Sequence, residues 1–179
     1  DLCENGTIEL LNASFVADET TIFGNLNKEY ADCEIDWYLS KSLNVNDMDC
    51  AVPKIWRQIS TDDGLINSNY GWCIFSNENG EQFINALNKL REDKHSRQAS
   101  MIYNRPSMHK DWNKGGMSDF ICTYAVQILI RKNALDYIVY MRSNDAMFGY
   151  KNDKYWHDFV HNEALNDLMN DAMEKGYIV

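Results

Sequence analysis

Two apolar segments joined by a short polar link constrain the fold of this chain more than any other feature. Residues 120–130 and 135–141 are its strongest apolar runs, and residues 131–134 lie between them. Both runs are short and rich in β-branched and aromatic side chains, which is typical of strands. The sequence therefore predicts a pair of strands in this part of the chain.

The rest of the chain alternates between helical and extended patterns. In residues 23–42, Leu26, Tyr30, Cys33 and Trp37 recur at spacings of three and four, as on one face of a helix. Further helices are predicted over 81–91 and 153–174, strands over 7–15, 99–104 and 177–179, a loop over 43–54 and a turn at 115–116. Because these elements follow no regular β-α-β rhythm, we expect an α/β (α+β) fold with a mixed sheet.

The composition indicates a folded domain that binds neither a nucleic-acid polymer nor a membrane. The chain has 179 residues, 45% of them apolar, and no internal repeat or linker, so a single domain over residues 1–179 is expected. Seventeen Lys and Arg against 27 Asp and Glu give a net charge of −10, which phosphate backbones would repel. A local cluster of arginines could still bind one nucleotide. No apolar run approaches the roughly 20 residues that span a bilayer.

Cysteine usage favours a reducing compartment. The chain has an odd number of cysteines, and they are scattered: Cys3, Cys33, Cys50, Cys73 and Cys122. None forms a C-x-x-C motif or lies at metal-ligand spacing from a histidine, so no metal site is expected. The N-terminus also lacks the basic and apolar regions of a signal peptide. These features together predict a cytoplasmic protein.

Common catalytic motifs are absent, so the placement of single residues carries the functional argument. Cys122 lies inside an apolar segment. It is either a small core residue or a nucleophile whose pKa a nearby cation would have to lower. Glu34 lies between Tyr30 and Trp37 on one helical face. It either reaches solvent or is a buried carboxyl with a raised pKa, suited to moving protons.

Arginines at the ends of predicted strands allow two interpretations as well. Arg142 follows an apolar strand and precedes Ser143. An arginine beside a hydroxyl group can grip a phosphate, but arginines at strand ends are often merely solvated. Arg97 and Arg105 flank another predicted strand and are ambiguous in the same way.

Polar residues of the last predicted helix have simple structural explanations. Asn152 and Asp153 open this helix, where both residue types are favoured as caps. The histidines occupy polar or helical settings and are predicted to lie at the surface: His95, His109, His157 and His161.

Six separated regions follow the order and spacing of one enzyme family over almost the whole chain. They are NASFVADETTIFG at 12–24, EIDWY at 34–38, PKIW and INSNYGW at 53–56 and 66–72, SRQASMIYNRPSM at 96–108, GMSDFICT at 116–123 and RSNDAMFGYKND at 142–153. These segments resemble the thymidylate synthase superfamily, and within it the branch that hydroxymethylates deoxycytidylate (dCMP). The resemblance implies the thymidylate synthase fold and a homodimer whose subunits pack sheet to sheet.

The resemblance also implies a role for each matching residue. Cys122 would be the nucleophile, Glu34 would organise proton transfer and water, and Asp153 would read the base where thymidylate synthases carry asparagine. The co-substrate would be 5,10-methylenetetrahydrofolate. Binding of the dCMP substrate is implied for Arg142 and Ser143 at its 5′-phosphate, Arg97 from the second subunit, Tyr70 and Trp56, and binding of the folate for Asp145, Gly149 and Trp56.

This sequence departs from the family pattern at three places. Gln98 replaces the second arginine of the usual pair, so one phosphate contact is expected to be missing. The family's N-terminal phosphate-loop arginine would precede Asp1, and its ribose-binding His and Tyr would follow Val179, so both ends of the family domain are expected to be lacking. Two alternatives stay open: a thymidylate synthase acting on dUMP, or a truncated, inactive nucleotide- or RNA-binding relative.

Overall fold

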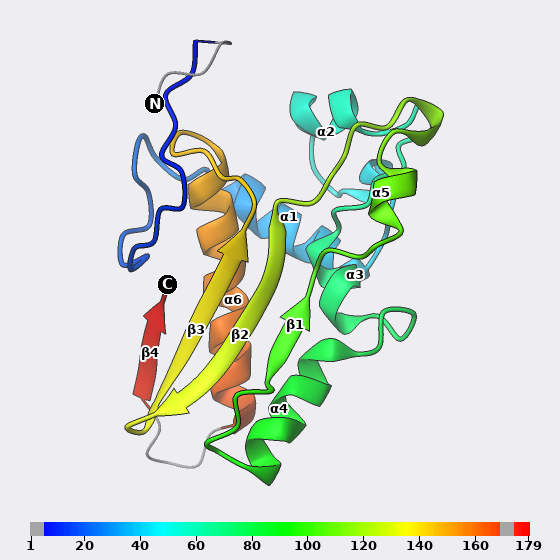
Figure 1. Ribbon diagram of the computed structural model, residues 1–179. Helices are drawn as coiled ribbons and strands as arrows, with labels where there is room; N and C mark the ends of the chain where they lie inside the picture. Colours follow the sequence, from blue (N-terminus) through cyan, green and yellow to red (C-terminus); the bar gives the residue numbers. More distant parts are fainter. Residues whose placement is uncertain (1–5, 169–173) are drawn as a thin grey trace.

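A four-stranded mixed sheet forms the centre of the molecule. The computed structural model describes residues 6–168 and 174–179 (Figure 1). The strands, in sheet order, are β1 (Ser100–Ile102), β2 (Thr123–Arg131), β3 (Ala134–Met141) and β4 (Glu174–Ile178). β1, β2 and β3 pair antiparallel, whereas β4 runs parallel to β3. The predicted mixed sheet is therefore confirmed, and β4 includes the start of the strand predicted over 177–179.

A two-residue turn joins β2 to β3. Lys132 and Asn133 both have positive φ, 51° and 62°, and Arg131 pairs with Ala134 across the turn. Two positive φ values match the right-handed twist of a hairpin, and asparagine adopts this conformation readily. The predicted strand pair is confirmed, with β2 beginning at Thr123 rather than at residue 120.

The predicted helices over 23–42 and 81–91 are confirmed, as α1 and α4. α1 begins late because the Asn27 side chain accepts a hydrogen bond from the backbone N–H of Tyr30, and it ends where Lys41 turns left-handed. The prediction of a strand over 7–15 is wrong, since this segment adds no strand to the sheet. The helices are α1 (Lys28–Ser40), α2 (Lys54–Ile59), α3 (Tyr70–Phe75), α4 (Gln82–Glu92), α5 (Met108–Asp111) and α6 (Gly149–Leu168), with 3₁₀ turns at Val45–Asp47 and Lys114–Gly116.

The last helix begins four residues earlier than predicted. The Asp145 carboxylate accepts hydrogen bonds from the backbone N–H groups of residues 147–149, at 3.0, 2.7 and 2.9 Å, and so caps α6. A Cβ at Gly149 would lie 2.8 Å from this carboxylate, so the cap needs glycine there. Interpreting Asn152 and Asp153 as caps is therefore wrong, because both lie inside α6.

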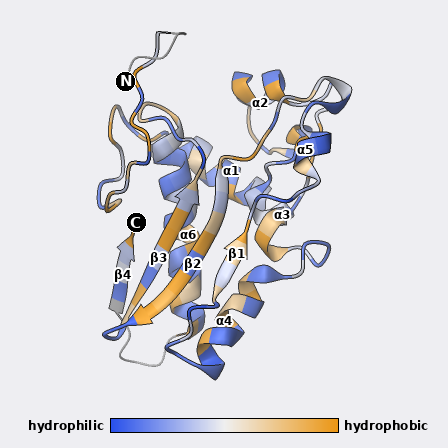
Figure 2. Ribbon diagram, viewed as in Figure 1, coloured by the Kyte–Doolittle hydropathy of each residue, from blue (hydrophilic) through white to orange (hydrophobic). Residues whose placement is uncertain are grey.

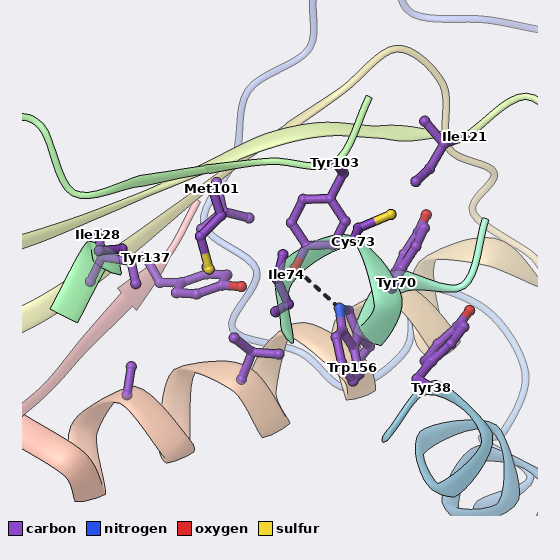
Figure 3. Packing of buried hydrophobic residues seen from close by; sticks show 14 of the residues in the cluster. Tyr38, Tyr70, Cys73, Ile74, Met101, Tyr103, Ile121, Ile128, Tyr137 and Trp156 are labelled. Atoms are coloured by element: carbon purple, nitrogen blue, oxygen red, sulfur yellow. Dashed lines mark hydrogen bonds between the residues drawn. The ribbon is translucent and has the colours of Figure 1, made fainter. Parts of the chain in front are cut away.

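Helices cover one face of the sheet, and the core lies between the two layers. α6 and α1 run behind the sheet, with α3 and α4 beside β1 (Figure 1). Hydrophobic residues run along β2 and β3 (Figure 2). Large aromatic side chains fill the core: Tyr38, Tyr70, Tyr103, Tyr137 and Trp156 (Figure 3), together with Trp37. In the described part of the chain, no helix combines the length and apolar composition needed to cross a membrane.

The other face of the sheet carries exposed apolar side chains. Ile102 of β1 and Tyr140 of β3 are 49% and 50% exposed, and both pair with Ala125 of β2 between them. Exposed aromatic and branched side chains in adjacent strands form a continuous apolar surface of the kind that partners cover.

One pair of cysteines forms a bond that the sequence did not predict. The structure joins Cys33 of α1 to Cys50, which lies in the segment between the Val45–Asp47 turn and α2. Cys73 and Cys122 are free thiols, and Cys3 lies outside the described residues. The disulfide fastens the predicted loop over 43–54 to α1, and it disagrees with the reducing environment that cysteine usage predicts.

The contact between α3 and α1 leaves no room for a side chain at Gly71. A Cβ there would lie 1.9 Å from the carbonyl oxygen of Tyr38. We expect Gly71→Ala to lower the free energy of unfolding by about 2–3 kcal/mol, because the backbones must separate. The control is Gly80→Asn, since a Cβ at Gly80 meets nothing within 4 Å and asparagine tolerates positive φ. Equal denaturation midpoints for both variants would contradict the prediction.

Candidate active site

The Glu34 carboxylate is buried against two hydrogen-bond donors. It is 6% exposed, and it accepts hydrogen bonds from the Tyr30 hydroxyl one turn earlier and from Trp56 Nε1 at 3.1 Å. Trp56 comes from α2, and its ring packs edge-on against Trp37. Burial raises the pKa of Glu34, while both hydrogen bonds act to lower it. A carboxyl directed to solvent is thus the wrong interpretation, and the buried carboxyl is confirmed.

Cys122 and Arg142 lie side by side. Cys122 is half-buried, and Arg142 Nη2 lies 3.7 Å from its Sγ. The guanidinium also donates to the carbonyls of Phe120 and Ile121, at 2.7 and 2.9 Å. Burial raises the pKa of the Cys122 thiol, and Arg142 only partly offsets this. The cation that a nucleophile needs is present, but the expected net lowering of the pKa is not found.

A buried carboxylate holds the segment that leads to Cys122. Asp119 accepts hydrogen bonds from the backbone N–H groups of Asn67 and Ser68, at 2.7 and 2.8 Å, and from the Ser68 hydroxyl at 2.6 Å. Burial raises its pKa, and these hydrogen bonds oppose that rise. Asp119 therefore joins two segments that are about fifty residues apart in the sequence.

Asp153 is a half-buried residue of α6 that interacts electrostatically with both Glu34 and Cys122. Its pKa is raised to about 8, first by burial and then by the Glu34 carboxylate, while a hydrogen bond from Tyr70 acts to lower it. The charge of Asp153 also acts on the pKa of Cys122. Two carboxyls and a thiol therefore interact electrostatically at one place.

The Tyr70 hydroxyl lies in a buried polar network. The ring of Tyr70 stacks on Tyr38, and its hydroxyl accepts a hydrogen bond from Thr123 Oγ1 at 3.2 Å. Thr123 directly follows Cys122 and also contacts His157. Predicting His157 and His161 at the surface is wrong, because they are 2% and 0% exposed. His95 and His109 are exposed, as predicted.

The other predicted residues are distributed around this site. Ser143 is exposed beside Arg142, and Asp145 with Gly149 forms the α6 cap described above. Arg105 lies over the ring of Trp72, and its Nη2 donates to Asn67 Oδ1 at 3.0 Å, so its side chain is not merely solvated. Arg97 is exposed near the start of β1.

Comparison with known proteins identifies the family. The sequence model of the thymidylate synthase family matches residues 25–160. The chain belongs to the thymidylate synthase family. Among curated proteins of this family, the deoxycytidylate 5-hydroxymethyltransferase of Enterobacteria phage T4 is 51% identical over 162 residues. That match covers 90% of this chain and 66% of the relative, so the chain spans just under two thirds of the relative's length. The sequence resemblance is confirmed.

More distant members of the thymidylate synthase family support the same fold. The thymidylate synthase of Francisella philomiragia is 27% identical over 126 residues, covering 65% of this chain and 46% of that protein. The structure of thermostable thymidylate synthase A from Bacillus subtilis superposes with a TM-score of 0.65 at 24% identity, covering 92% of this chain and 60% of that one. Thymidylate synthase from T4 phage gives 0.67 at 17% identity, covering 91% and 59%. The predicted fold is therefore confirmed.

Sequence reasoning missed four residues that support the site: Tyr30, Asp119, Thr123 and His157. Asp119 and Thr123 lie within three residues of Cys122, and a charged or hydroxyl side chain beside an apolar segment was the available signal. His157 follows Asp153 by one helical turn, so the two share a face of α6. The helical periodicity places Tyr30 on the same face as Glu34 but does not predict its hydrogen bond to the carboxylate.

The raised pKa of Asp153 makes stability depend on pH. The unfolded chain releases this proton near pH 4 and the folded chain near pH 8, so ionisation increasingly favours unfolding between these values. Asn carries no proton to lose. We expect the free energy of unfolding of Asp153→Asn to equal that of wild type near pH 4 and to be about 2 kcal/mol higher at pH 8.5. The difference stays this small because the side chain is only half-buried and solvent screens its charge.

Thermal denaturation at the two pH values measures this difference. Asp36→Asn, on the exposed side of α1, is the matched control, and its difference in stability from wild type should be the same at both pH values. A difference between Asp153→Asn and wild type that is independent of pH would contradict the prediction.

Proposed function

We propose that this chain is the catalytic part of a deoxycytidylate 5-hydroxymethyltransferase that acts on dCMP in the cytoplasm. The observation that carries the proposal is a carboxyl group, Asp153, at the centre of the site beside the free thiol of Cys122. The 51% identity to the phage T4 protein of that name supports the same activity.

The chemistry begins with the thiol. Carbon 5 of a pyrimidine is a poor nucleophile, and addition of the Cys122 thiolate to carbon 6 makes it enamine-like. Arg142 favours the thiolate, and with Ser143 it would bind the 5′-phosphate. After carbon 5 has taken up the one-carbon unit, loss of its proton and expulsion of Cys122 as thiolate restore the aromatic ring. Glu34, fixed by Tyr30 and Trp56, would take a proton from the water that supplies the new hydroxyl.

Asp153 would select cytosine. Once it has given its proton to the base, the Asp153 carboxylate accepts a hydrogen bond from the exocyclic amine of cytosine, whereas it would meet the carbonyl oxygen of uracil with lone pair against lone pair. The ring nitrogen of cytosine is also an acceptor, so it needs a proton from the second carboxyl oxygen. With a pKa of about 8, Asp153 carries that proton at neutral pH, and the ring nitrogen of cytosine can take it, whereas the ring nitrogen of uracil already bears a hydrogen. Sharing it offsets the charge that enters the ring when Cys122 adds.

The residues expected at the folate fit a flat, hydrogen-bonding ring system. Trp56 offers a half-buried aromatic ring. The exposed carboxylate of Asp145 uses three of its roughly four acceptor positions on α6, which leaves one for an N–H group of a ligand. Gly149 adds no side chain beside that carboxylate. 5,10-Methylenetetrahydrofolate would supply the one-carbon unit when bound.

A homodimer would bring Arg97 to the phosphate. Ser100 pairs with Gln127, so Arg97 lies beside the far half of β2, whereas Cys122 precedes its first residue. At about 3.3 Å per residue, Arg97 and Cys122 of one subunit are roughly 20 Å apart. The exposed apolar sheet face around Ile102 and Tyr140 would be the surface on which the second copy packs.

Base preference tests the function. We expect wild type to use dCMP far better than dUMP, and Asp153→Asn to move the preference towards dUMP by at least a hundredfold, because an amide pairs with the carbonyl and ring N–H of uracil but has no proton to transfer to cytosine. The measurement is kcat/KM for both nucleotides with methylenetetrahydrofolate. Cys122→Ser should be inactive on both, whereas Cys73→Ala, which changes a buried thiol outside the site, should keep the preference. An unchanged ratio in Asp153→Asn would refute base selection by this residue.

Mixing inactive variants tests the dimer. Cys122→Ser and Arg97→Ala should each be inactive alone. When co-refolded, they form heterodimers in which one site has both residues intact, so about a quarter of wild-type activity should return. Lys94→Ala, which removes an exposed cation three residues before Arg97, should be active alone. Heterodimers without recovered activity would exclude a role for Arg97 across the interface.

A further inference from the structure

A chain of buried polar groups connects His157 with Asp153. The imidazole of His157 lies between two hydroxyls, with Tyr137 OH 3.3 Å from Nδ1 and Thr123 Oγ1 3.5 Å from Nε2. Thr123 donates to the Tyr70 hydroxyl at 3.2 Å, and Tyr70 hydrogen-bonds to Asp153. Elements far apart in the sequence supply these groups: β2, β3, α3 and α6.

The hydrogen bonds that run from His157 through Thr123 to Tyr70 share one direction. Burial lowers the pKa of His157 to about 3, so its ring is neutral, with one donor and one acceptor nitrogen. Thr123 gives its only proton to Tyr70, so its oxygen must accept from Nε2–H of His157. Nδ1 is then the acceptor nitrogen and faces the Tyr137 hydroxyl, which also hydrogen-bonds to Tyr103. Since Tyr70 already accepts from Thr123, its own proton is directed at Asp153.

We infer that His157 is a positioning residue, which acts through Thr123 to keep the Tyr70 hydroxyl directed at the Asp153 carboxyl. Without the imidazole, the Thr123 hydroxyl loses its donor and can rotate, so Tyr70 is no longer fixed as a donor. Thr123 is also the residue after Cys122, so the same contact supports the backbone of the nucleophile. The inference rests on the proposed function and adds a residue to its specificity apparatus.

His161 provides a matched comparison. It lies one turn further along α6, is fully buried, and its Nε2 lies 2.6 Å from the backbone carbonyl of Leu135. Its described hydrogen bond therefore ends on the backbone of β3 instead of continuing to Thr123. Removing either imidazole costs a similar amount of buried packing, and only the loss of His157 interrupts the path to Asp153.

Kinetics of the full chain test the inference. We expect His157→Leu and Thr123→Val each to lower kcat for dCMP about tenfold, the size of one lost charge-assisted hydrogen bond, with KM changed less than about twofold. The double variant should be no worse than either single one, because both break the same path. His157→Gln, whose amide also donates and accepts, should recover to within about threefold of wild type, and His161→Leu should keep kcat. Additive losses, or equal losses in His157→Leu and His161→Leu, would overturn the inference.

A titration that needs no turnover separates this inference from the proposed function. Carbon-13 NMR of labelled aspartate follows the Asp153 carboxyl, with Asp153→Asn for assignment. In His157→Leu the midpoint should rise by about one pH unit, because the carboxylate loses a donor, and in His161→Leu it should not move. The titratable groups that act on or are acted on by Asp153 are Tyr30, Glu34 and Tyr38 of α1, Tyr70 of α3, Tyr103 after β1, Cys122, and Asp145 before α6.

The two hypotheses then fail separately. A wild-type chain that does not hydroxymethylate dCMP refutes the proposed function, and the positioning role of His157 is still decided by the titration. An Asp153 midpoint that is the same in wild type and His157→Leu overturns the positioning role, whatever the activity.

Discussion

The geometry of the site depends on the carboxylate of Asp119, which ties two distant segments together. Its hydrogen bonds to Asn67 and Ser68 fix the segment that reaches Cys122 three residues later, and Tyr70 follows Ser68 by two residues. The same hydrogen bonds therefore fix the position of the thiol relative to the Tyr70 hydroxyl. Separating the two segments would leave a buried carboxylate without hydrogen bonds, at a cost of several kcal/mol, so the segments keep a fixed arrangement.

The site has two halves that meet on a third element. α1 and α2 supply Glu34 and Trp56, whereas the start of β2 and the end of β3 supply Cys122 and Arg142. α6 packs behind both and carries Asp153, whose pKa responds to Glu34 on one side and to Tyr70 on the other. α6 therefore joins the two halves, together with the direct contact of α3 with α1 at Gly71.

Local sequence patterns predicted the elements whose structure depends on neighbouring residues. The hairpin and α1 follow from hydrophobic runs and periodicity, and the segments shared with the family located Glu34 and Cys122. Prediction failed where residues distant in the sequence determine burial. The polar side chain of His157 lies in the core because the hydroxyls of Tyr137 and Thr123 contact its ring nitrogens. α3 has six residues, too few for periodicity, and depends on the close approach at Gly71.

The disulfide between Cys33 and Cys50 gives the two halves different sensitivities to redox conditions. It closes a loop with a sequence separation of 17, and Cys33 directly precedes Glu34. A crosslink of this size restricts the unfolded chain by about 3 kcal/mol. Reduction would lower the stability of the whole domain and free the Cys50 segment from the helix that carries Glu34, whereas no disulfide restrains the segment around Cys122.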